Sequence, residues 1–143
     1  MNKLLLCVML GCSVPVVSFA ASPAEVVQAA PLKMVIQVSD ADAKKWNLSL
    51  NNAMNVQKEL GKDGSVIEIV AFGPGINMLK FDSEVGGRVQ DALAAGIKIV
   101  ACENSMHGMQ LKPEDMQVGI GYVKAGVVEI ARKELAGYAY IRP

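Results

Sequence analysis

The stretch Ile97-Lys98-Ile99-Val100-Ala101-Cys102-Glu103-Asn104-Ser105 decides how this chain folds. Its first five residues are apolar except for one lysine, and the polar residues after Cys102 are of the kind that begin a helix. A short run that is apolar on both faces is typical of a strand in a parallel sheet with helices on both sides. The pattern therefore predicts a buried strand over 97–101 that leads through Cys102 into a short helix over 104–110.

The same order of strand and helix recurs before and after this stretch. We expect further strands at 33–38, 66–72, 118–123 and 138–141. Apolar residues spaced three and four apart predict helices over 46–60, 85–93 and 127–135, each followed by a glycine that ends it. Those glycines are Gly61, Gly96 and Gly137. Residues 39–42 can cap the first helix, and Pro113 suits the first turn of another.

This alternation predicts a single α/β domain. Near-continuous apolar strands joined by right-handed helical crossovers give a three-layer, flavodoxin-like fold with a mostly parallel sheet of about five strands. The 143 residues suffice for one such domain with its own core and are too few for two. In folds of this kind, ligands and chemistry gather at the carboxyl ends of the strands, which is where Cys102 stands.

The first 20 residues resemble a signal peptide more than part of this domain. Lys3 gives a positive start, residues 4–17 are almost wholly apolar or small, and Ser18-Phe19-Ala20 predicts cleavage before Ala21. We therefore expect a signal peptide over 1–20, a flexible lead-in over 21–32 and the domain over 33–143. The mature protein is then periplasmic or secreted and has no membrane span.

Two alternatives remain for this leader. An uncut membrane anchor would need roughly 20 apolar residues, and the apolar run here is shorter and contains Gly11 and Pro15. A lipoprotein would be cleaved at Met9-Leu10-Gly11-Cys12, which approximates a lipobox. Cleavage there would leave an apolar spacer at the start of the mature protein, so we favour cleavage before Ala21 over lipidation of Cys12.

Charge and composition exclude two classes of protein. The chain has 14 Lys and Arg side chains against 14 Asp and Glu, so it lacks the basic excess of a nucleic-acid binder. A hydrophobic share of 52%, with no low-complexity run, excludes a disordered chain. We expect a globular protein that binds no nucleic acid.

Cys102 is the main candidate for chemistry. Cleavage before Ala21 removes Cys7 and Cys12, so the mature chain keeps one thiol and has no internal disulfide. A thiol just before a helix has a lowered pKa, which favours the nucleophilic thiolate. His107, five residues on, is a candidate base if its ring reaches the sulfur. The alternative is that Cys102 is a small buried apolar residue at the end of a strand.

Other motifs favour structural interpretations. Cys102-Glu103-Asn104-Ser105 has the C-x-x-S form of a redox motif, which in thioredoxin-like folds follows the first strand rather than the third. Gly73-Pro74-Gly75 could be a phosphate loop, but Pro74 has no N–H to offer, so we predict a tight turn. The acidic residues at 39–42 do not suit a flavin phosphate. We therefore expect no cofactor.

A lone histidine, a carboxylate inside a strand and a group of asparagines give weaker indications of function. His107 is the only histidine and no second ligand lies at metal spacing from Cys102, so we expect no metal site. Glu68, inside an apolar strand, is expected near the wet end of that strand or paired with a lysine. Asn51, Asn52 and Asn55 are poor helix formers on one helix, and we interpret them as an oligomer contact.

Four segments together resemble the DsrE/DsrF-like (YchN-like) family. They are Gly73-Pro74-Gly75-Ile76, Ala101-Cys102-Glu103-Asn104-Ser105-Met106, Gly126-Val127-Val128-Glu129-Ile130 and Gly137-Tyr138-Ala139-Tyr140-Ile141-Arg142-Pro143. The resemblance runs over about 33–143 and implies a three-layer α/β fold that assembles into homo- or hetero-oligomers, often trimers or hexamers. In the sulfur-relay branches of the family it also implies a cysteine that carries persulfide sulfur between partner proteins, and Cys102 stands where that cysteine is expected.

Two classes of function follow from the residues and the resemblance. In the first, the chain is a sulfur-relay protein in which Cys102 accepts sulfane sulfur from a donor protein and passes it to an acceptor. This is carriage of sulfur more than enzymatic turnover, so an enzymatic activity stays open. In the second, the chain is a non-catalytic oligomeric binding protein with the same fold.

Overall fold

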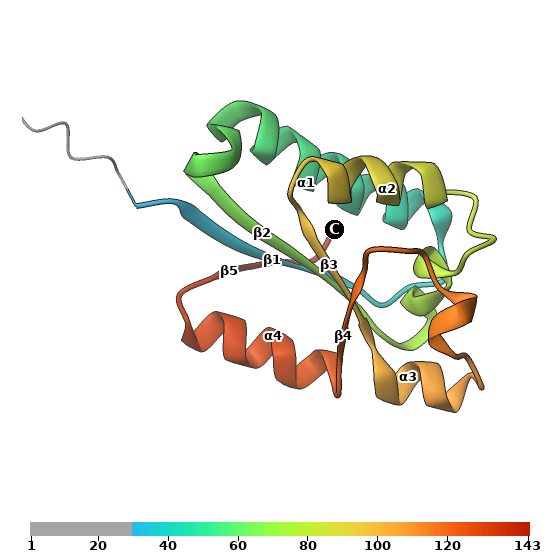
Figure 1. The fold of residues 1–143 in the computed structure, drawn as a ribbon. Coiled ribbons are helices and arrows are strands. Elements are labelled where there is room, and N and C mark those ends of the chain that lie inside the picture. Colours follow the sequence, from blue (N-terminus) through green and yellow to red (C-terminus); the bar gives the residue numbers. More distant parts are fainter. Residues whose placement is uncertain (1–29) are drawn as a thin grey trace, which may run out of the picture.

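The computed structural model describes residues 30–143 (Figure 1). The expected signal peptide over 1–20 and most of the lead-in over 21–32 lie outside the described residues. The strands are β1 (Leu32–Val38), β2 (Ser65–Ala71), β3 (Lys98–Cys102), β4 (Gly121–Val123) and β5 (Ala139–Ile141). They form one five-stranded sheet in the order β4-β3-β2-β1-β5, and every neighbouring pair is parallel. The prediction of a parallel α/β sheet is confirmed.

Four α-helices and two 3₁₀ segments connect the strands. They are α1 (Ala43–Gly64), η1 (Gly73–Leu79), α2 (Gly86–Ala94), α3 (Glu103–Gly108), η2 (Pro113–Asp115) and α4 (Gly126–Leu135). The side chain of Asp42 accepts a hydrogen bond from the Lys44 N–H at 2.9 Å and so caps α1, as predicted. The glycines expected to end the long helices all have positive φ: 91° at Gly96, 83° at Gly137 and 74° at Gly61, where α1 is broken by a kink and continues to Gly64.

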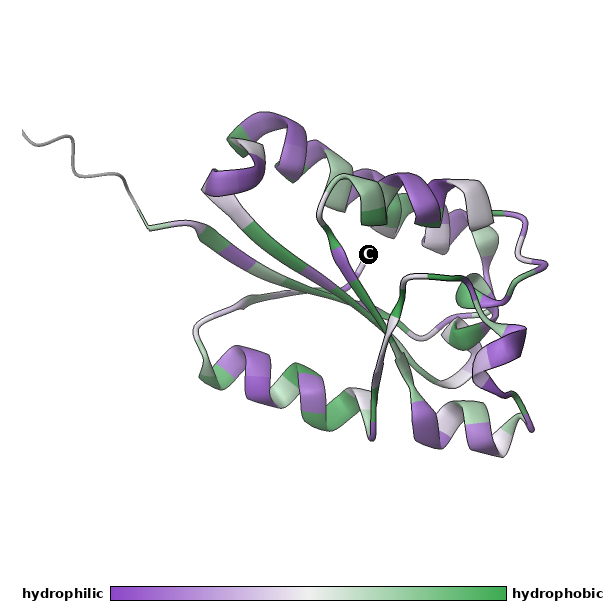
Figure 2. Ribbon diagram, viewed as in Figure 1, coloured by the Kyte–Doolittle hydropathy of each residue, from purple (hydrophilic) through white to green (hydrophobic). Residues whose placement is uncertain are grey.

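Most of the core lies between the sheet and the pair α1 and α2. Alternate residues of the three central strands, among them Ile36, Ile69 and Ile99, face this layer and are fully or almost fully buried. They pack against Leu50 of α1 and Val89 of α2, both with no exposed surface. Figure 2 shows the strands largely in the colour of hydrophobic residues, which matches their burial in a parallel sheet.

The opposite face of the sheet has a thinner apolar layer. Its buried cluster contains Val35, Val70 and Val100 from the three central strands and Ile130 from α4. As Figure 1 shows, α4 lies across this face on the side away from α1 and α2. The prediction of three layers is therefore confirmed. The apolar core on the side of α1 and α2 contains many more buried residues than the one under α4.

The connection that enters β4 and the connection that leaves it lie on opposite faces of the sheet. The segment that leads from η2 to β4 passes over α2, where the side chain of Gln90 donates to Gln117 and to the carbonyl of Val118. The connection from β4 to β5 is α4, on the opposite face. The carboxyl ends of β3 and β4 lie at the edge of the sheet where parallel sheets of this kind bind ligands.

Two elements predicted near this point are present but shorter than the sequence indicated. The strand expected over 118–123 covers only Gly121–Val123. The amide of Gln117 donates to the carbonyls of Lys80 and Phe81, and Gly119 has φ of 86°, so the chain turns over α2 before it can join the sheet. The helix expected from Pro113 does begin there, but it is a single 3₁₀ turn that ends at Asp115, whose side chain accepts a hydrogen bond from the N–H of Lys112.

Candidate functional site

Cys102 is the last residue of β3 and lies at the carboxyl end of the sheet, beside β4. Its register partner on β4 is Val123, and only 4% of its surface is exposed. Cys102 lies two residues beyond Val100, so the two share the face of the sheet that α4 covers. Beside it, α3 begins at Glu103 and α4 begins at Gly126, and the N–H of Asn104 donates to the carbonyl of Lys124 at 3.2 Å. The starts of two helices therefore meet at the sulfur.

Hydrogen-bond donors surround the sulfur from both helix starts. The backbone N–H groups of Asn104 and Ser105 approach it from α3, and that of Gly126 approaches it from α4. In the thiol form, Cys102 Sγ can donate to the carbonyl oxygen of Lys124 at 3.9 Å. In the thiolate form it can only accept, and its partners are then the N–H groups of Gly126 and Ser105, together with that of Asn104, which is shared with the Lys124 carbonyl.

Ser105 gives the sulfur a fourth donor. The Ser105 hydroxyl oxygen accepts a hydrogen bond from the Gly73 N–H at 2.8 Å, which leaves its own proton free for another partner. The hydroxyl also lies within hydrogen-bonding reach of Cys102. A chain of donors therefore runs from Gly73 through Ser105 to the sulfur.

The balance of these effects favours the thiolate. Burial raises the pKa of the Cys102 thiol, because a charge is poorly solvated there. The hydrogen bonds from the Ser105 hydroxyl and from the N–H groups of Gly126, Ser105 and Asn104 act in the opposite sense. Together they hold the pKa below its ordinary value of 9.0, which is the direction expected of a nucleophilic cysteine.

Two glycines permit the close packing behind this arrangement. A Cβ atom on Gly75 would lie 2.2 Å from the carbonyl oxygen of Val38, so only glycine lets η1 approach the end of β1. A Cβ on Gly126 would lie 3.0 Å from Cβ of Phe72, so glycine also lets α4 start close to β2. The run Gly73-Pro74-Gly75 is thus a tight turn, as predicted, and its first N–H supports Ser105.

The structure does not bring His107 to the sulfur. His107 is exposed on α3, whereas Met106 beside it is buried. None of the groups that act on the Cys102 thiol belongs to His107, and the position nearest the sulfur on α3 is taken by Ser105. His107 instead lines two surface hollows with Leu111.

Two hollows flank the sulfur without reaching it. On the side of α3, a hollow of about 240 Å³ is lined by Glu103, Met106, His107, Leu111, Pro113 and Tyr122; we call it the apolar hollow. On the side of α4, a hollow of about 290 Å³ is lined by Val123, Lys124, Ala125, Val128, Glu129 and Arg132; we call it the cationic hollow. Cys102 lines neither of them, but it precedes Glu103 of the first in the chain, and its sulfur lies 3.9 Å from the carbonyl oxygen of Lys124 of the second.

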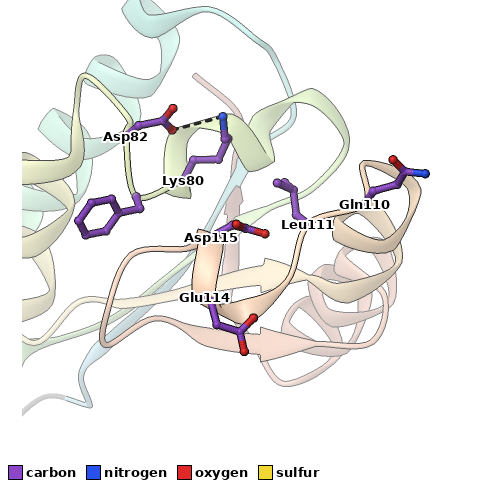
Figure 3. A pocket seen from close by; sticks show the side chains of 7 residues that line it. Lys80, Asp82, Gln110, Leu111, Glu114 and Asp115 are labelled. Carbon is purple, nitrogen blue, oxygen red and sulfur yellow. Dashed lines mark ion pairs between the residues drawn. The ribbon is translucent and has the colours of Figure 1, made fainter.

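Another hollow has a lining that does not include Cys102 (Figure 3). It measures about 530 Å³ and lies between the loop after η1 and the loop before η2. Lys80 Nζ is 3.2 Å from Asp82 Oδ1, and Asp115 accepts a hydrogen bond from the backbone N–H of Lys112, so the one lysine of the lining is already paired. We therefore place the candidate site at Cys102, where the donors converge on one reactive atom.

The other candidate residues have structural partners. Glu68 is buried under α4, and its Oε2 lies 2.7 Å from Lys133 Nζ and 3.0 Å from Lys98 Nζ, so the predicted pairing with lysine is confirmed. Burial lowers the pKa of Lys133, but its hydrogen bond to Glu68 and the nearby negative charge raise it above its usual range. On α1, the side chain of Asn51 accepts from Arg88 of α2, which ties the two helices together.

Residues 30–143 contain neither a metal-binding cluster nor a membrane-spanning helix. In that part of the chain, His, Cys, Asp and Glu side chains nowhere gather in a group of three or more that could hold a metal ion. None of its helices is long and apolar enough to cross a membrane.

Known structures resemble this fold closely. The protein of unknown function MTH1491 from Methanobacterium thermoautotrophicum is 31% identical, with a TM-score of 0.74 over 78% of this chain and 99% of the other. The ychN protein from E. coli is 14% identical, with a TM-score of 0.64 over 78% and 99% of the two chains. The chain belongs to the DsrE/DsrF-like (YchN-like) family. The protein BT1422 of Bacteroides thetaiotaomicron shares the fold of this family with the chain, at 20% identity and a TM-score of 0.63 over 78% and 94% of the two chains.

Comparison by sequence alone finds less. No model of a known protein family matches the chain, and no curated protein matches it. Membership of the DsrE/DsrF-like family therefore comes from the MTH1491 match and the shared fold, and the four segments identified in the sequence agree with it. Sequence reasoning also passed over Gly126 as a donor and gave Ser105 only a capping role, because both reach the sulfur through contacts between separate segments.

Proposed function

We propose that this DsrE/DsrF-like protein is a sulfur-relay protein that carries sulfane sulfur as a persulfide on Cys102. The observation that carries the proposal is the convergence of donors on one sulfur atom: three backbone N–H groups and the Ser105 hydroxyl. A persulfide is more acidic than a thiol, so its anion gains from the same donors. The family resemblance supports the proposal, because it implies that sulfur-relay members carry sulfur on a cysteine at the position of Cys102.

The transfer needs no outside oxidant. The Cys102 thiolate attacks the terminal sulfur of a donor persulfide, R–S–S–H, and a new S–S bond forms at Sγ. The S–S bond of the donor breaks, and its electron pair leaves with the donor as R–S⁻. The product is Cys102–S–S–H, and attack by an acceptor thiolate on its outer sulfur reverses the exchange and regenerates the Cys102 thiolate.

The decisive test is mass gain on Cys102. We expect the wild-type protein to gain about 32 Da, one sulfur atom, after treatment with inorganic polysulfide, and a dithiol reductant to remove it. Cys102→Ser keeps the side-chain volume nearly constant, so it should fold and gain no mass. A folded wild-type protein that gains no sulfur and alkylates no faster than a free thiol would leave the non-catalytic binding protein as the remaining function.

The role of His107 is settled by the same assay. In this proposal Ser105 and the helix starts activate the sulfur, so His107→Ala should change the rate of sulfur loading by less than about twofold. A larger loss would return the imidazole to the reaction as a base that reaches the sulfur only when the donor is bound.

We further propose that the chain is exported and self-associates. Several large apolar side chains are well exposed, including Leu135 at 90%, Val118 at 78% and Phe81 at 73%, and contacts between copies would cover them. Light scattering of the mature domain should give a closed oligomer, and a monomer mass at high micromolar concentration would contradict it.

The proposed export has its own test. Amino-terminal sequencing of the exported protein should start at Ala21, whereas a lipid on Cys12 would contradict the proposed cleavage.

A further inference from the structure

The cationic hollow and the Cys102 sulfur share one wall. The carbonyl oxygen of Lys124 lies 3.9 Å from Sγ, and the N–H of Gly126 is among the donors to that sulfur. Lys124 and Ala125, from the same stretch of backbone, line the hollow. The segment 124–126 therefore has the sulfur on one side and the hollow on the other, and its middle residue has only a methyl group as side chain.

The charges of this hollow favour an anion. Lys124 and Arg132 both line it, and the ion pairs within residues 30–143 include neither of them. The one acidic residue in the lining, Glu129, lies 3.6 Å from Lys133 Nζ and is thereby compensated. Two cationic side chains at a concave surface concentrate anions there.

The rest of the lining suits the chemistry of sulfur. Val123, Ala125 and Val128 give the hollow an apolar floor next to its two cations. A chain of sulfane sulfur atoms is apolar along its length and carries its charge at its ends, so such a chain could contact both kinds of surface. The apolar hollow across the sulfur is a poorer match, because its lining contains Glu103 and neither lysine nor arginine.

We propose that the cationic hollow binds the sulfur donor of Cys102 as an anion, specifically an inorganic polysulfide. This inference rests on the proposed function and adds the class of donor to it. Lys124 and Arg132 hold the negative ends of the polysulfide, and its terminal sulfur reaches Sγ past the side chain of Ala125. With tetrasulfide, the Cys102 thiolate and S₄²⁻ give Cys102–S–S⁻ and S₃²⁻: one S–S bond forms, one breaks, and the electron pair leaves on the trisulfide.

A pair of alkylating reagents tests the charge preference independently of sulfur chemistry. Iodoacetate and iodoacetamide react with the same thiolate and lose the same leaving group, but only iodoacetate is an anion. The ratio of their rates therefore cancels any change in the pKa of Cys102. In Lys124→Met/Arg132→Met the ratio of iodoacetate to iodoacetamide should fall by about tenfold, with a similar loss in the rate of sulfur loading from tetrasulfide.

The matched control removes two positive charges from the opposite face. Lys44→Met/Lys58→Met carries the same change in net charge on α1, so its ratio should stay within about twofold of the wild type at physiological salt. Ala125→Leu should slow both alkylating reagents equally, because it narrows the path without altering charge. Circular dichroism should show that all three variants are folded.

The outcomes separate this inference from the proposed function. If tetrasulfide loads Cys102 but the Lys124→Met/Arg132→Met variant keeps the wild-type ratio, the anion site is wrong and the sulfur-relay function stands. If the ratio falls as expected but no sulfur is loaded, the hollow does bind anions next to Cys102 and the sulfur-relay function is wrong. If Cys102 in the folded protein reacts with neither reagent, the path from the hollow is wrong.

Discussion

Cys102 and Glu68 are two buried acidic groups on the same face of the sheet, and the fold treats them differently. The carboxylate of Glu68 lies between two lysines, with Lys133 Nζ at 2.7 Å and Lys98 Nζ at 3.0 Å. The Cys102 sulfur has no cationic side chain among its partners and is surrounded by N–H groups and one hydroxyl. One anion is neutralised by ion pairs, and the other is stabilised by dipoles.

This difference decides what each group can do. An ion pair under a helix fixes the position of both partners, so Glu68 and Lys133 hold α4 against the sheet. Dipoles lower the energy of the thiolate without neutralising its charge, and they come from backbone groups that are already in place. The same helix takes part in both arrangements: Lys133, seven residues beyond Gly126 on α4, pairs with Glu68, and the first N–H of α4 reaches the sulfur.

The largest effect is expected from removing the buried carboxylate. Glu68→Ala leaves Lys133 without its closest anion under α4, and we expect the free energy of unfolding to fall by about 3 kcal/mol. Urea unfolding followed by circular dichroism measures it. Replacing both partners, in Glu68→Met/Lys133→Met, should recover most of the loss, because no buried charge is then left unpaired. A loss below about 1 kcal/mol for Glu68→Ala would show that water or rearrangement compensates Lys133.

The next effect tests whether the start of α4 must lie close to the sulfur. In Gly126→Ala the new methyl group meets the side chain of Phe72, with Phe72 Cβ at 3.0 Å, so the start of α4 and this side chain must move apart. We expect a loss of about 1–3 kcal/mol in unfolding free energy and slower alkylation of Cys102, because the Gly126 N–H moves away.

A matched glycine exists at the start of α2. A Cβ on Gly87 would have no neighbour within 4 Å, so Gly87→Ala should leave the alkylation rate unchanged and stabilise the fold by up to about 1 kcal/mol. Equal effects of the two substitutions would contradict the role of close packing at Gly126.

Ser105 tests the dipole arrangement by the loss of one donor. Ser105→Ala removes the hydroxyl that connects the Gly73 N–H to the sulfur, so the pKa of Cys102 should rise. The rate of reaction with iodoacetamide near neutral pH should fall by about threefold, since the loss of thiolate is partly offset by its higher nucleophilicity. Ser105→Thr keeps the hydroxyl and should keep most of the rate. An unchanged rate in Ser105→Ala would assign the lowered pKa to the backbone N–H groups alone.

The smallest expected effect is the dependence of stability on pH. The pKa of Cys102 is lowered in the folded protein, so its thiolate adds stability that is fully present above the unfolded pKa and is lost as pH falls through the folded pKa. The difference in unfolding free energy between the wild type and Cys102→Ser should therefore grow as pH rises toward the ordinary thiol pKa of 9.0.

The measurement should stay below about pH 10, because Lys133 and Tyr122, whose pKa values are both raised, titrate above that range. The Lys133 contribution is present below its unfolded pKa and is lost as pH rises through its folded pKa, so it leaves this window unchanged. A difference between wild type and Cys102→Ser that is constant across the window would mean that the folded protein does not favour the thiolate.

Local sequence determined most of the fold. Apolar runs such as 97–101 and the spacing of helical stripes predicted the central strands and the long helices, because burial on two faces or on one stripe leaves a periodic pattern in the chain. Gly61, Gly96 and Gly137 marked helix ends, since positive φ is a local requirement. The position of Cys102 at the end of a buried strand was predictable for the same reason.

Only the tertiary structure decided the surroundings of that cysteine. Gly73, Ser105 and Gly126 come from three separate segments, and their convergence on one sulfur follows from the strand order and from the direction of each crossover. Spacing along the chain pointed to His107 instead, but the turn of α3 leaves it exposed. Local periodicity fixes which residues are buried, whereas the contacts between buried segments depend on how the whole sheet is assembled.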